Sequence, residues 1–313
     1  MSNIINNVQI IQITQCITPQ RIDNYLFSKF KKTPKSIIYK ILRTGQIKVN
    51  KKKVLPKYKI QEGDIIRIPP LQNRNNNKKK EITNYNDKLK LKQKILFEDE
   101  HILVINKPSG IAVHGGSGIH LGIIEQLRIL YYNYKYLELV HRIDKETSGV
   151  LLVAKKRTIL NHLHQQFRDH KIKKIYIALI HGHWSNHNKT IKIPLLKKLN
   201  SIAINKKKVY VHQLGKISET QIKIIKYYKL TTLIYAIPIT GRTHQIRVHT
   251  THMGHPVVFD NRYGSKILDT KIDSHNRQKR LLLHARSISF IHPFTKKQLC
   301  IKAPLDCSFE KYL

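Results

Sequence analysis

Asp144 occupies a place where a carboxylate is costly, next to an apolar run that is typical of a buried strand. The segment ELVHRIDKETSGVLLVAKK, residues 138–156, puts this aspartate two positions after Arg142 and directly before Lys145. A carboxylate beside buried strand residues costs free energy unless it is paired or used in chemistry. This segment alone leaves both a structural ion pair and a reactive carboxylate open.

Two common kinds of catalytic site do not fit the other polar segments. A zinc site on His244, His249 and His252 lacks the HExxH spacing, and no cysteine or carboxylate completes the ligand shell. A Ser-His-Asp triad lacks the G-x-S-x-G turn around its serine. The GGSG stretch at 115–118 is not followed by the Lys-Ser/Thr of a phosphate loop. We therefore expect no metal ion and no small-molecule cofactor.

A single carboxylate with arginines near it limits the chemistry. Two-carboxylate hydrolysis of a glycosidic bond needs a second acid, and Glu146, two residues further on, is not paired with Asp144 in this interpretation. A lone carboxylate can act as a nucleophile or stabilise a cationic sugar carbon. An arginine beside it keeps it ionised. The pattern favours chemistry at a sugar carbon.

The charge of the chain indicates a polyanionic partner. The 313 residues include 58 Lys and Arg against 19 Asp and Glu, which gives a formal net charge of +39. Nucleic acid or an anionic membrane suits such a charge, although A/T-rich codon usage also enriches Lys, Ile and Asn.

No apolar stretch approaches the ~20 residues of a membrane helix, and the N-terminal segment lacks the features of a signal peptide. Cys16, Cys300 and Cys307 have no paired spacing. We expect a reduced, soluble, cytoplasmic protein without a membrane partner.

Residues 19–70 are predicted to form a small basic domain. PQRIDNYLFSKF has apolar residues at helical spacing, a second helix opens at Thr33-Pro34 and breaks at Gly45, and short strands follow around Gly63. The unit resembles the alpha-L RNA-binding domain, best known from a small-subunit ribosomal protein. The resemblance rests on Arg21, Asp23, Leu26, Ile38, Gly45, Val49, Asn50, Gly63 and Asp64.

A linker and a larger domain follow. Residues 71–92 are polar and low in complexity, which predicts a flexible basic linker. Residues 93–313 mix apolar strand patterns, such as VLLVAKK and KKIYIALIHGHW, with helical patterns, such as GIIEQLRIL and TILNHLHQQFRDH. The expected fold is α+β, with a mixed, largely antiparallel sheet in this domain after the small N-terminal RNA-binding domain.

Five motifs occur in the second domain in a fixed order. They are NKPSGIAVHGG, HRIDKETSGVLLVAKK, GRTHQIRVH, GHPVVFDNRYG and RLLLHA. This set is similar to the motifs of RNA pseudouridine synthases, whose catalytic motif reads H-R-L-D-x-x-T-S-G. The resemblance covers Arg21 to Leu305 apart from the linker. It implies an isomerase that detaches uracil from its ribose, turns it and rejoins it through C5, without metal or cofactor.

The resemblance implies three catalytic residues. Asp144 matches the catalytic aspartate, and Arg247 matches the basic residue that pairs with it, with Arg242 as the weaker candidate. Tyr176 matches the active-site tyrosine. Its ring can stack on the target uracil, and its hydroxyl is a candidate base for the C5 proton. The resemblance leaves open whether the aspartate adds to C1′ or promotes a glycal intermediate.

Further residues are implied to hold the substrate. A uridine inside folded RNA must be flipped out to reach a carboxylate, which costs roughly a few kcal/mol for unstacking. Arg142 is implied to support the flipped strand, and Arg242 lies in the same motif as Arg247. Arg280 and Leu283 match the R-x-x-L of the last motif, with Leu283 packing against the base. Loop-shaping residues are implied to be His141, Thr147, Ser148 and Gly149.

The implied partner is 23S large-subunit ribosomal RNA, with several sites near the peptidyl-transferase region. We expect the chain to act as a monomer. Two alternatives stay open: a synthase acting mainly on transfer RNA, and a non-catalytic RNA-binding factor for ribosome assembly on the same scaffold. The intact Asp144, Tyr176 and Arg247 argue against the second alternative.

Overall fold

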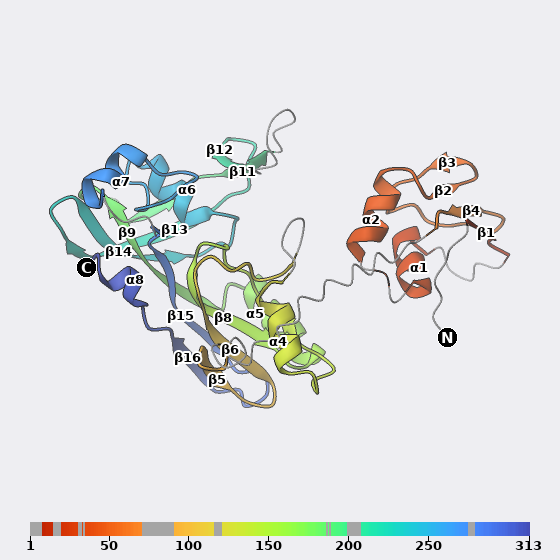
Figure 1. Ribbon diagram of the computed structural model, residues 1–313, viewed down its shortest axis with the longest axis horizontal. Helices are drawn as coiled ribbons and strands as arrows, with labels where there is room; N and C mark the ends of the chain where they lie inside the picture. The colour runs from red at the N-terminus through yellow and green to blue at the C-terminus, as the bar shows by residue number, and fades with distance from the viewer. Residues whose placement is uncertain are drawn as a thin grey trace. The chain divides into compact units, whose positions relative to one another are not determined.

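The computed structural model divides the chain into two compact units, Met1–Glu81 and Ile82–Leu313 (Figure 1). Most of the predicted linker, residues 71–90, lies outside the described residues. The hydrophobic cores of the two units share no residue, and Leu91 already belongs to the core of the second unit. The structure describes residues 8–14, 20–30, 33, 35–70, 91–115, 121–185, 187, 189–198, 208–274 and 279–313.

The first unit packs two helices on a small sheet. Ile22, Leu26, Ile38 and Leu42 are fully buried between these helices and the strands, as the helical spacing of the apolar residues predicts. Gly45 has φ +71° and ends the second helix where the sequence predicted its break. Within the described part of this unit, the sheet order is β1 (Gln9–Gln12), β4 (Ile65–Ile68), β2 (Lys48–Val49) and β3 (Lys52–Lys53), and the helices are α1 (Ile22–Lys29) and α2 (Lys35–Arg43).

Strand β1 lies before the predicted start of the domain at residue 19. It pairs antiparallel with β4, from Gln9 opposite Ile68 to Gln12 opposite Ile65. Its burial alternates only weakly, and Ile10 is largely exposed. An edge strand of this length has too short a pattern to stand out in the sequence, which explains why the predicted boundary leaves it out.

The second unit is built on one large, mixed sheet. Strands β8 and β15 run parallel, whereas the other neighbouring strands of the described sheet pair antiparallel. The predicted α+β fold with a largely antiparallel sheet is therefore confirmed. In sheet order the strands are β10 (Thr190–Lys192), β13 (Glu219–Tyr227), β14 (Thr231–Pro238), β9 (Lys173–His181), β15 (Leu283–Ile291), β8 (Ser148–Ala154), β6 (Ile102–Lys107) and β5 (Ile95–Glu98), with β16 (Gln298–Lys302) beside β15 and β7 (Glu138–Leu139) beside β8.

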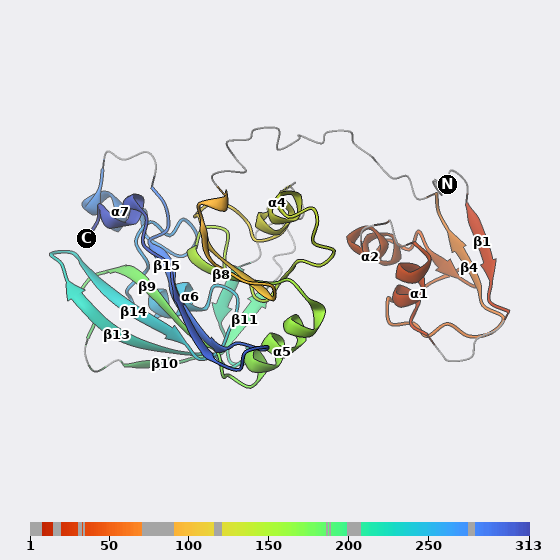
Figure 2. The same cartoon turned by 90° about the horizontal axis from the view of Figure 1, so that it is seen from below.

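Helices cover both faces of this sheet. Alternate residues of β8 and β6 point to opposite sides, and both sides are buried. Leu152 packs in one cluster with α5 (Arg157–Arg168), while Leu151 packs in another with α4 (Ile123–Leu130). Figure 2 shows these two helices on opposite sides of β8. Burial on both faces explains why VLLVA is continuously apolar.

The other half of the sheet carries a short hairpin and three further helices. The hairpin consists of β11 (Leu195–Lys198) and β12 (Lys208–Val211), which pair antiparallel. The helices are α6 (Gln245–His252), α7 (Lys266–Ile272) and α8 (Cys307–Glu310). In the part of the chain that the structure describes, no helix combines the length and hydropathy needed to cross a membrane.

Candidate active site

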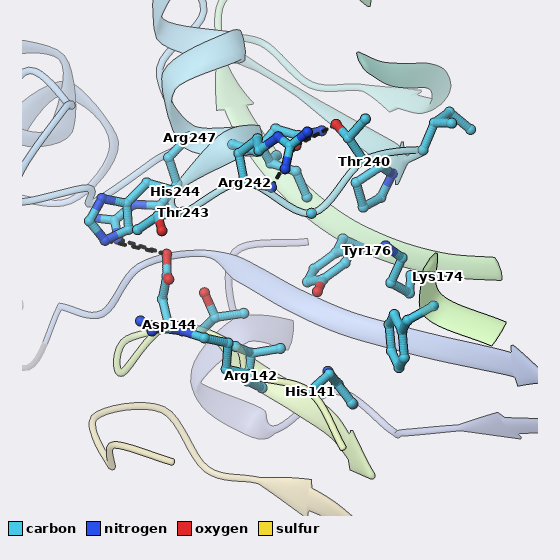
Figure 3. Close-up of a pocket in the computed structure, with 18 of the residues that line it drawn as sticks. His141, Arg142, Asp144, Lys174, Tyr176, Thr240, Arg242, Thr243, His244 and Arg247 are labelled. Carbon is cyan, nitrogen blue, oxygen red and sulfur yellow. Dashed lines mark hydrogen bonds and ion pairs between the residues drawn. The ribbon is translucent and has the colours of Figure 1, made fainter. Parts of the chain in front are cut away.

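The structure brings the motif residues of four separate segments to one pocket. The pocket has a volume of about 510 Å³, which lies within the range of ~300–1,000 Å³ typical of small-molecule sites. It is located where the loop before β8 faces strand β9 and the N-terminus of α6 (Figure 3). Six of the predicted site residues line it: Arg142, Asp144, Tyr176, Arg242, Arg247 and Leu283.

Asp144 lies in a loop whose backbone is fixed by the turn after β6. Lys107 Nζ donates to the carbonyl of Lys145 at 3.0 Å, and Gly110 N donates to the same carbonyl at 2.9 Å. The Ser109 hydroxyl donates to the carbonyl of Glu146 at 2.6 Å. Burial lowers the pKa of Lys107 to about 7. The NKPSG motif therefore holds the loop that carries Asp144 by hydrogen bonds to its main chain.

Arg247 is placed between two carboxylates. Its Nε and Nη2 donate to Asp260 at 2.7 Å each, in a two-point contact, and its Nη1 donates to Asp144 Oδ2 at 3.3 Å. Burial lowers the pKa of Arg247, but the hydrogen bonds and charge of Asp260 outweigh burial and leave the pKa raised. The two-point contact with Asp260 thus fixes the orientation of the guanidinium group, and its third nitrogen, Nη1, faces Asp144. The predicted proximity of Arg247 and Asp144 is present.

Asp260 is a site residue that sequence reasoning missed. It is almost fully buried and also accepts hydrogen bonds from the backbone nitrogens of Arg262 and Tyr263. Burial raises its pKa, but the contact with Arg247 outweighs burial and leaves the pKa lowered. The resemblance of the motif GHPVVFDNRYG gave this acid no role. An aspartate directly after the apolar run VVF was the available signal, because such an acid needs a cation.

Tyr176 lies on β9 and contributes an aromatic wall to the pocket. Burial and, to a smaller degree, the charge of Asp144 raise the pKa of its hydroxyl. The phenol is therefore protonated at neutral pH. Leu283 at the start of β15 is buried in the same hydrophobic cluster. Together they form the apolar side of the pocket, opposite the polar group around Asp144.

Arg142 and Arg242 are exposed side chains at the pocket. Arg242 Nε donates to the carbonyl of Ile217 at 3.2 Å, and among the described residues no hydrogen bond or ion pair joins Arg242 to Asp144. The structure thus favours Arg247 over Arg242 as the neighbour of the aspartate. His141 accepts a hydrogen bond from Leu152 N at 3.0 Å, and burial lowers its pKa to about 3. This contact agrees with a loop-shaping role for His141.

Arg280 does not line the pocket, so its predicted role as a substrate contact has no support in this geometry. Its Nη2 contacts both carboxylate oxygens of Asp306 at 2.8 and 2.9 Å, and its Nε donates to Ser308 at 2.6 Å. Its Nη1 donates to Ser148 Oγ at 3.2 Å. The side chain connects the region of α8 to the start of β8. The motif spacing of Arg280 and Leu283 did not distinguish a half-buried side chain that holds parts of the fold together from one that contacts the substrate.

Two family models match the chain, one in each unit. The family model described as RNA pseudouridylate synthase matches residues 101–252, and the model of the S4 domain matches residues 20–66. The chain belongs to the RNA pseudouridine synthases, and its first unit is an S4 domain.

Relatives match over the full length of the chain. The protein named "Ribosomal large subunit pseudouridine synthase C" from Buchnera aphidicola subsp. Acyrthosiphon pisum (strain APS) is 51% identical over 100% of this chain and 99% of its own length. The protein of the same name from Vibrio cholerae serotype O1 is 47% identical over 100% of this chain and 98% of its own length. The solved structure of human RNA Pseudouridylate Synthase Domain Containing 4 is 26% identical, with a TM-score of 0.57 over 72% of this chain and 94% of that chain.

Proposed function

We propose that the chain converts specific uridines of 23S large-subunit ribosomal RNA to pseudouridine, acting as a cytoplasmic monomer. The observation that carries this proposal is the pocket in which Asp144, Arg247 and Tyr176 meet. Full-length relatives at 47% and 51% identity carry the name of a large-subunit ribosomal enzyme, which supports the choice of RNA.

The geometry supports a division of roles between the two sides of the pocket. Asp144 acts at C1′ of the flipped uridine, and the C1′–N1 bond breaks with its electron pair going to uracil. Arg247 compensates the charge of the carboxylate from 3.3 Å. Uracil then turns, C5 bonds to C1′, and the ring loses its C5 proton and gains a proton at N1. The product is an isomer of the substrate, so no co-reactant is consumed.

Tyr176 stacks on the uracil as a neutral phenol in this proposal. Its raised pKa means that the hydroxyl holds its proton at neutral pH. The phenol oxygen can therefore accept the C5 proton only if the hydroxyl gives up its own proton to another acceptor in the same step. Leu283 packs against the other apolar part of the base, and Arg142 and Arg242 contact the RNA strand from the exposed edge of the pocket.

Pseudouridine mapping of three purified RNAs tests the substrate. We expect the protein to modify deproteinised 23S RNA at a small set of uridines and to leave 16S RNA and total transfer RNA unmodified. Asp144→Asn, processed in parallel, controls for contaminating enzymes. Modification of transfer RNA at a higher kcat/KM than 23S RNA would replace the proposed substrate with the alternative one.

A further inference from the structure

His244 has an unusual backbone conformation beside the reactive carboxylate. It is the residue before α6 and has φ 53° and ψ 22°, in the left-handed region that residues other than glycine seldom adopt. Such conformations persist where surrounding contacts fix them, and they cluster at functional sites. The side chain is 11% exposed and lines the pocket. Contacts on both ring nitrogens indicate what this conformation achieves.

The Nδ1 side of the ring contacts a tyrosine whose hydroxyl is already oriented. Val209 N, in β12, donates to Tyr263 Oη at 3.0 Å, and Tyr263 Oη lies 2.8 Å from His244 Nδ1. A phenol has one proton to donate. Among the described residues, His244 Nδ1 is the acceptor found for the hydroxyl proton of Tyr263. Tyr263 therefore donates to Nδ1, and the neutral ring carries its own proton on Nε2.

The Nε2 side of the ring faces Asp144. Nε2 lies 3.8 Å from Asp144 Oδ2, the same oxygen that Arg247 Nη1 contacts at 3.3 Å (Figure 3). No hydrogen bond to Oδ1 is found among the described residues. The hydrogen bond from Arg247 and the nearby Nε2 of His244 both lie on the Oδ2 side of the carboxylate, which leaves Oδ1 for the substrate.

We propose that His244 is a positioning residue that holds Asp144 through an Nε2–H group whose tautomer is set by Tyr263 and the backbone of Val209. This proposal rests on the proposed role of Asp144 in the reaction. At 3.8 Å, Nε2 lies beyond hydrogen-bond distance of Oδ2, and we expect the two atoms to come within that distance when RNA fills the pocket.

The Val209 end of this series of contacts packs against α6, and burial keeps the His244 ring neutral. Leu195 and Val209 of the β11–β12 hairpin pack against Val248 of α6, which anchors the donor N–H of Val209. Burial lowers the pKa of His244 to about 4, with the charges of Asp144, Arg247, Arg262 and Asp260 as smaller influences. A neutral ring carries one N–H, as the proposed tautomer requires.

His244→Gln and His244→Asn form a matched pair for the first test. Glutamine can place an N–H near the position of Nε2, whereas asparagine replaces only the Nδ1 side and does not reach Asp144. Asparagine, however, tolerates the left-handed conformation better than glutamine.

Under single-turnover conditions at saturating RNA, we expect His244→Asn to lower the rate by about 100-fold, the cost typical of a misplaced reacting group. His244→Gln should keep most of the rate, and RNA affinity should be alike in both. Higher activity in the asparagine variant would mean that His244 serves only the backbone turn.

The second test reads the tautomer directly. Nitrogen-15 NMR of histidine-labelled protein, with His244 assigned by loss of its signals in His244→Asn, should show Nε2 protonated in the wild type. Tyr263→Phe should give a mixture of tautomers and a lower rate, whereas Tyr235→Phe, at an exposed tyrosine of β14, should change neither. An Nδ1–H tautomer in the wild type would overturn the proposal. Because NMR needs no RNA, this result is independent of which RNA the enzyme modifies.

Discussion

Asp144 is 19% exposed and faces two nitrogen groups of different strength. Arg247 supplies a full charge, whereas His244 supplies a neutral N–H at a longer distance. Neither group depends on Asp144 for its own placement, because Asp260 holds Arg247 and Tyr263 holds His244. The carboxylate can therefore be changed without dismantling its surroundings.

Asp144→Asn should abolish pseudouridine formation and leave the protein folded. The amide keeps the size of the side chain and can still accept from Arg247, but it lacks the negative charge that acts at C1′. We expect the free energy of unfolding to stay within about 1 kcal/mol of the wild type, with RNA affinity retained. Denaturant unfolding, RNA binding and pseudouridine mapping on one preparation check the three parts. Turnover well above a mock preparation would remove Asp144 from the catalytic role.

Arg247→Ala should destabilise the fold mainly through Asp260. The alanine leaves a buried carboxylate without a cation, which costs about 3–5 kcal/mol. Adding Asp260→Asn to Arg247→Ala should cost less than the sum of the two single changes, with a coupling of roughly 0.5–3 kcal/mol. Unfolding curves for wild type, single and double variants measure this coupling.

Two further variants separate the partners of Arg247. The coupling of Arg247→Ala with Asp144→Asn should be smaller than with Asp260→Asn, because the Asp144 contact is a single, longer one. Arg242→Ala should leave stability nearly unchanged, since that side chain is exposed. A larger coupling with Asp144 than with Asp260 would contradict this division.

The sequence identified the residues that meet in the pocket better than the residues that support them. Asp144, Tyr176 and Arg247 were named because their segments resemble those of the pseudouridine synthases, and the structure places all three at one pocket. Asp260 and Tyr263 lie in the motif GHPVVFDNRYG, but their partners Arg247 and His244 lie in another segment, so the motif alone did not show what they hold. Arg280 shows the converse, because its motif was visible but its partner Asp306 was not.

At the scale of elements, the site depends on the parallel contact between β8 and β15. Gly149 pairs with Ala285 there and has φ +107°. A Cβ built on Gly149 would lie 2.2 Å from the carbonyl oxygen of Ala285. The glycine thus allows the strand that follows the Asp144 loop to approach β15 closely.

Gly149→Ala should destabilise the protein by at least about 2 kcal/mol, because the left-handed conformation and the steric overlap both act against it. Gly110→Ala is the matched control. Gly110 has φ +86° but no atom within 4 Å of the added Cβ, so it carries the conformational cost alone. Thermal unfolding of both variants measures the difference. Equal losses of stability would mean that β8 and β15 can separate without cost.

Elements with long, regular patterns were predicted well, and short edge elements were not. Helix α5 and strands β8 and β9 follow from apolar periods that span several residues. Strand β1 is defined by its pairing with β4, and its own residues carry little signal. The predicted domain, residues 19–70, therefore does not include β1, because pairing with β4 and not an apolar pattern defines this strand.

At the scale of the whole molecule, the net charge of +39 is shared between a catalytic unit and an S4 domain with separate cores. Every residue placed at the pocket belongs to the second unit. The first unit carries exposed cations on its small sheet, such as Lys48 on β2, which lies opposite Arg67 on β4. Such a surface suits phosphate contacts, which set affinity and register but perform no chemistry.

Removal of residues 1–81 should weaken binding to 23S RNA more than it slows the reaction at saturating RNA. Each phosphate that the shortened protein no longer neutralises should also reduce the slope of log K against log salt by about 0.7 on single-stranded RNA. The full-length double variant Lys48→Gln with Arg67→Gln tests the same surface with the domain in place, and we expect an intermediate slope. Binding is measured over a salt series, and single-turnover rates are measured with RNA well above Kd. Identical affinities and slopes for the full-length and shortened proteins would show that the catalytic unit alone binds the phosphates.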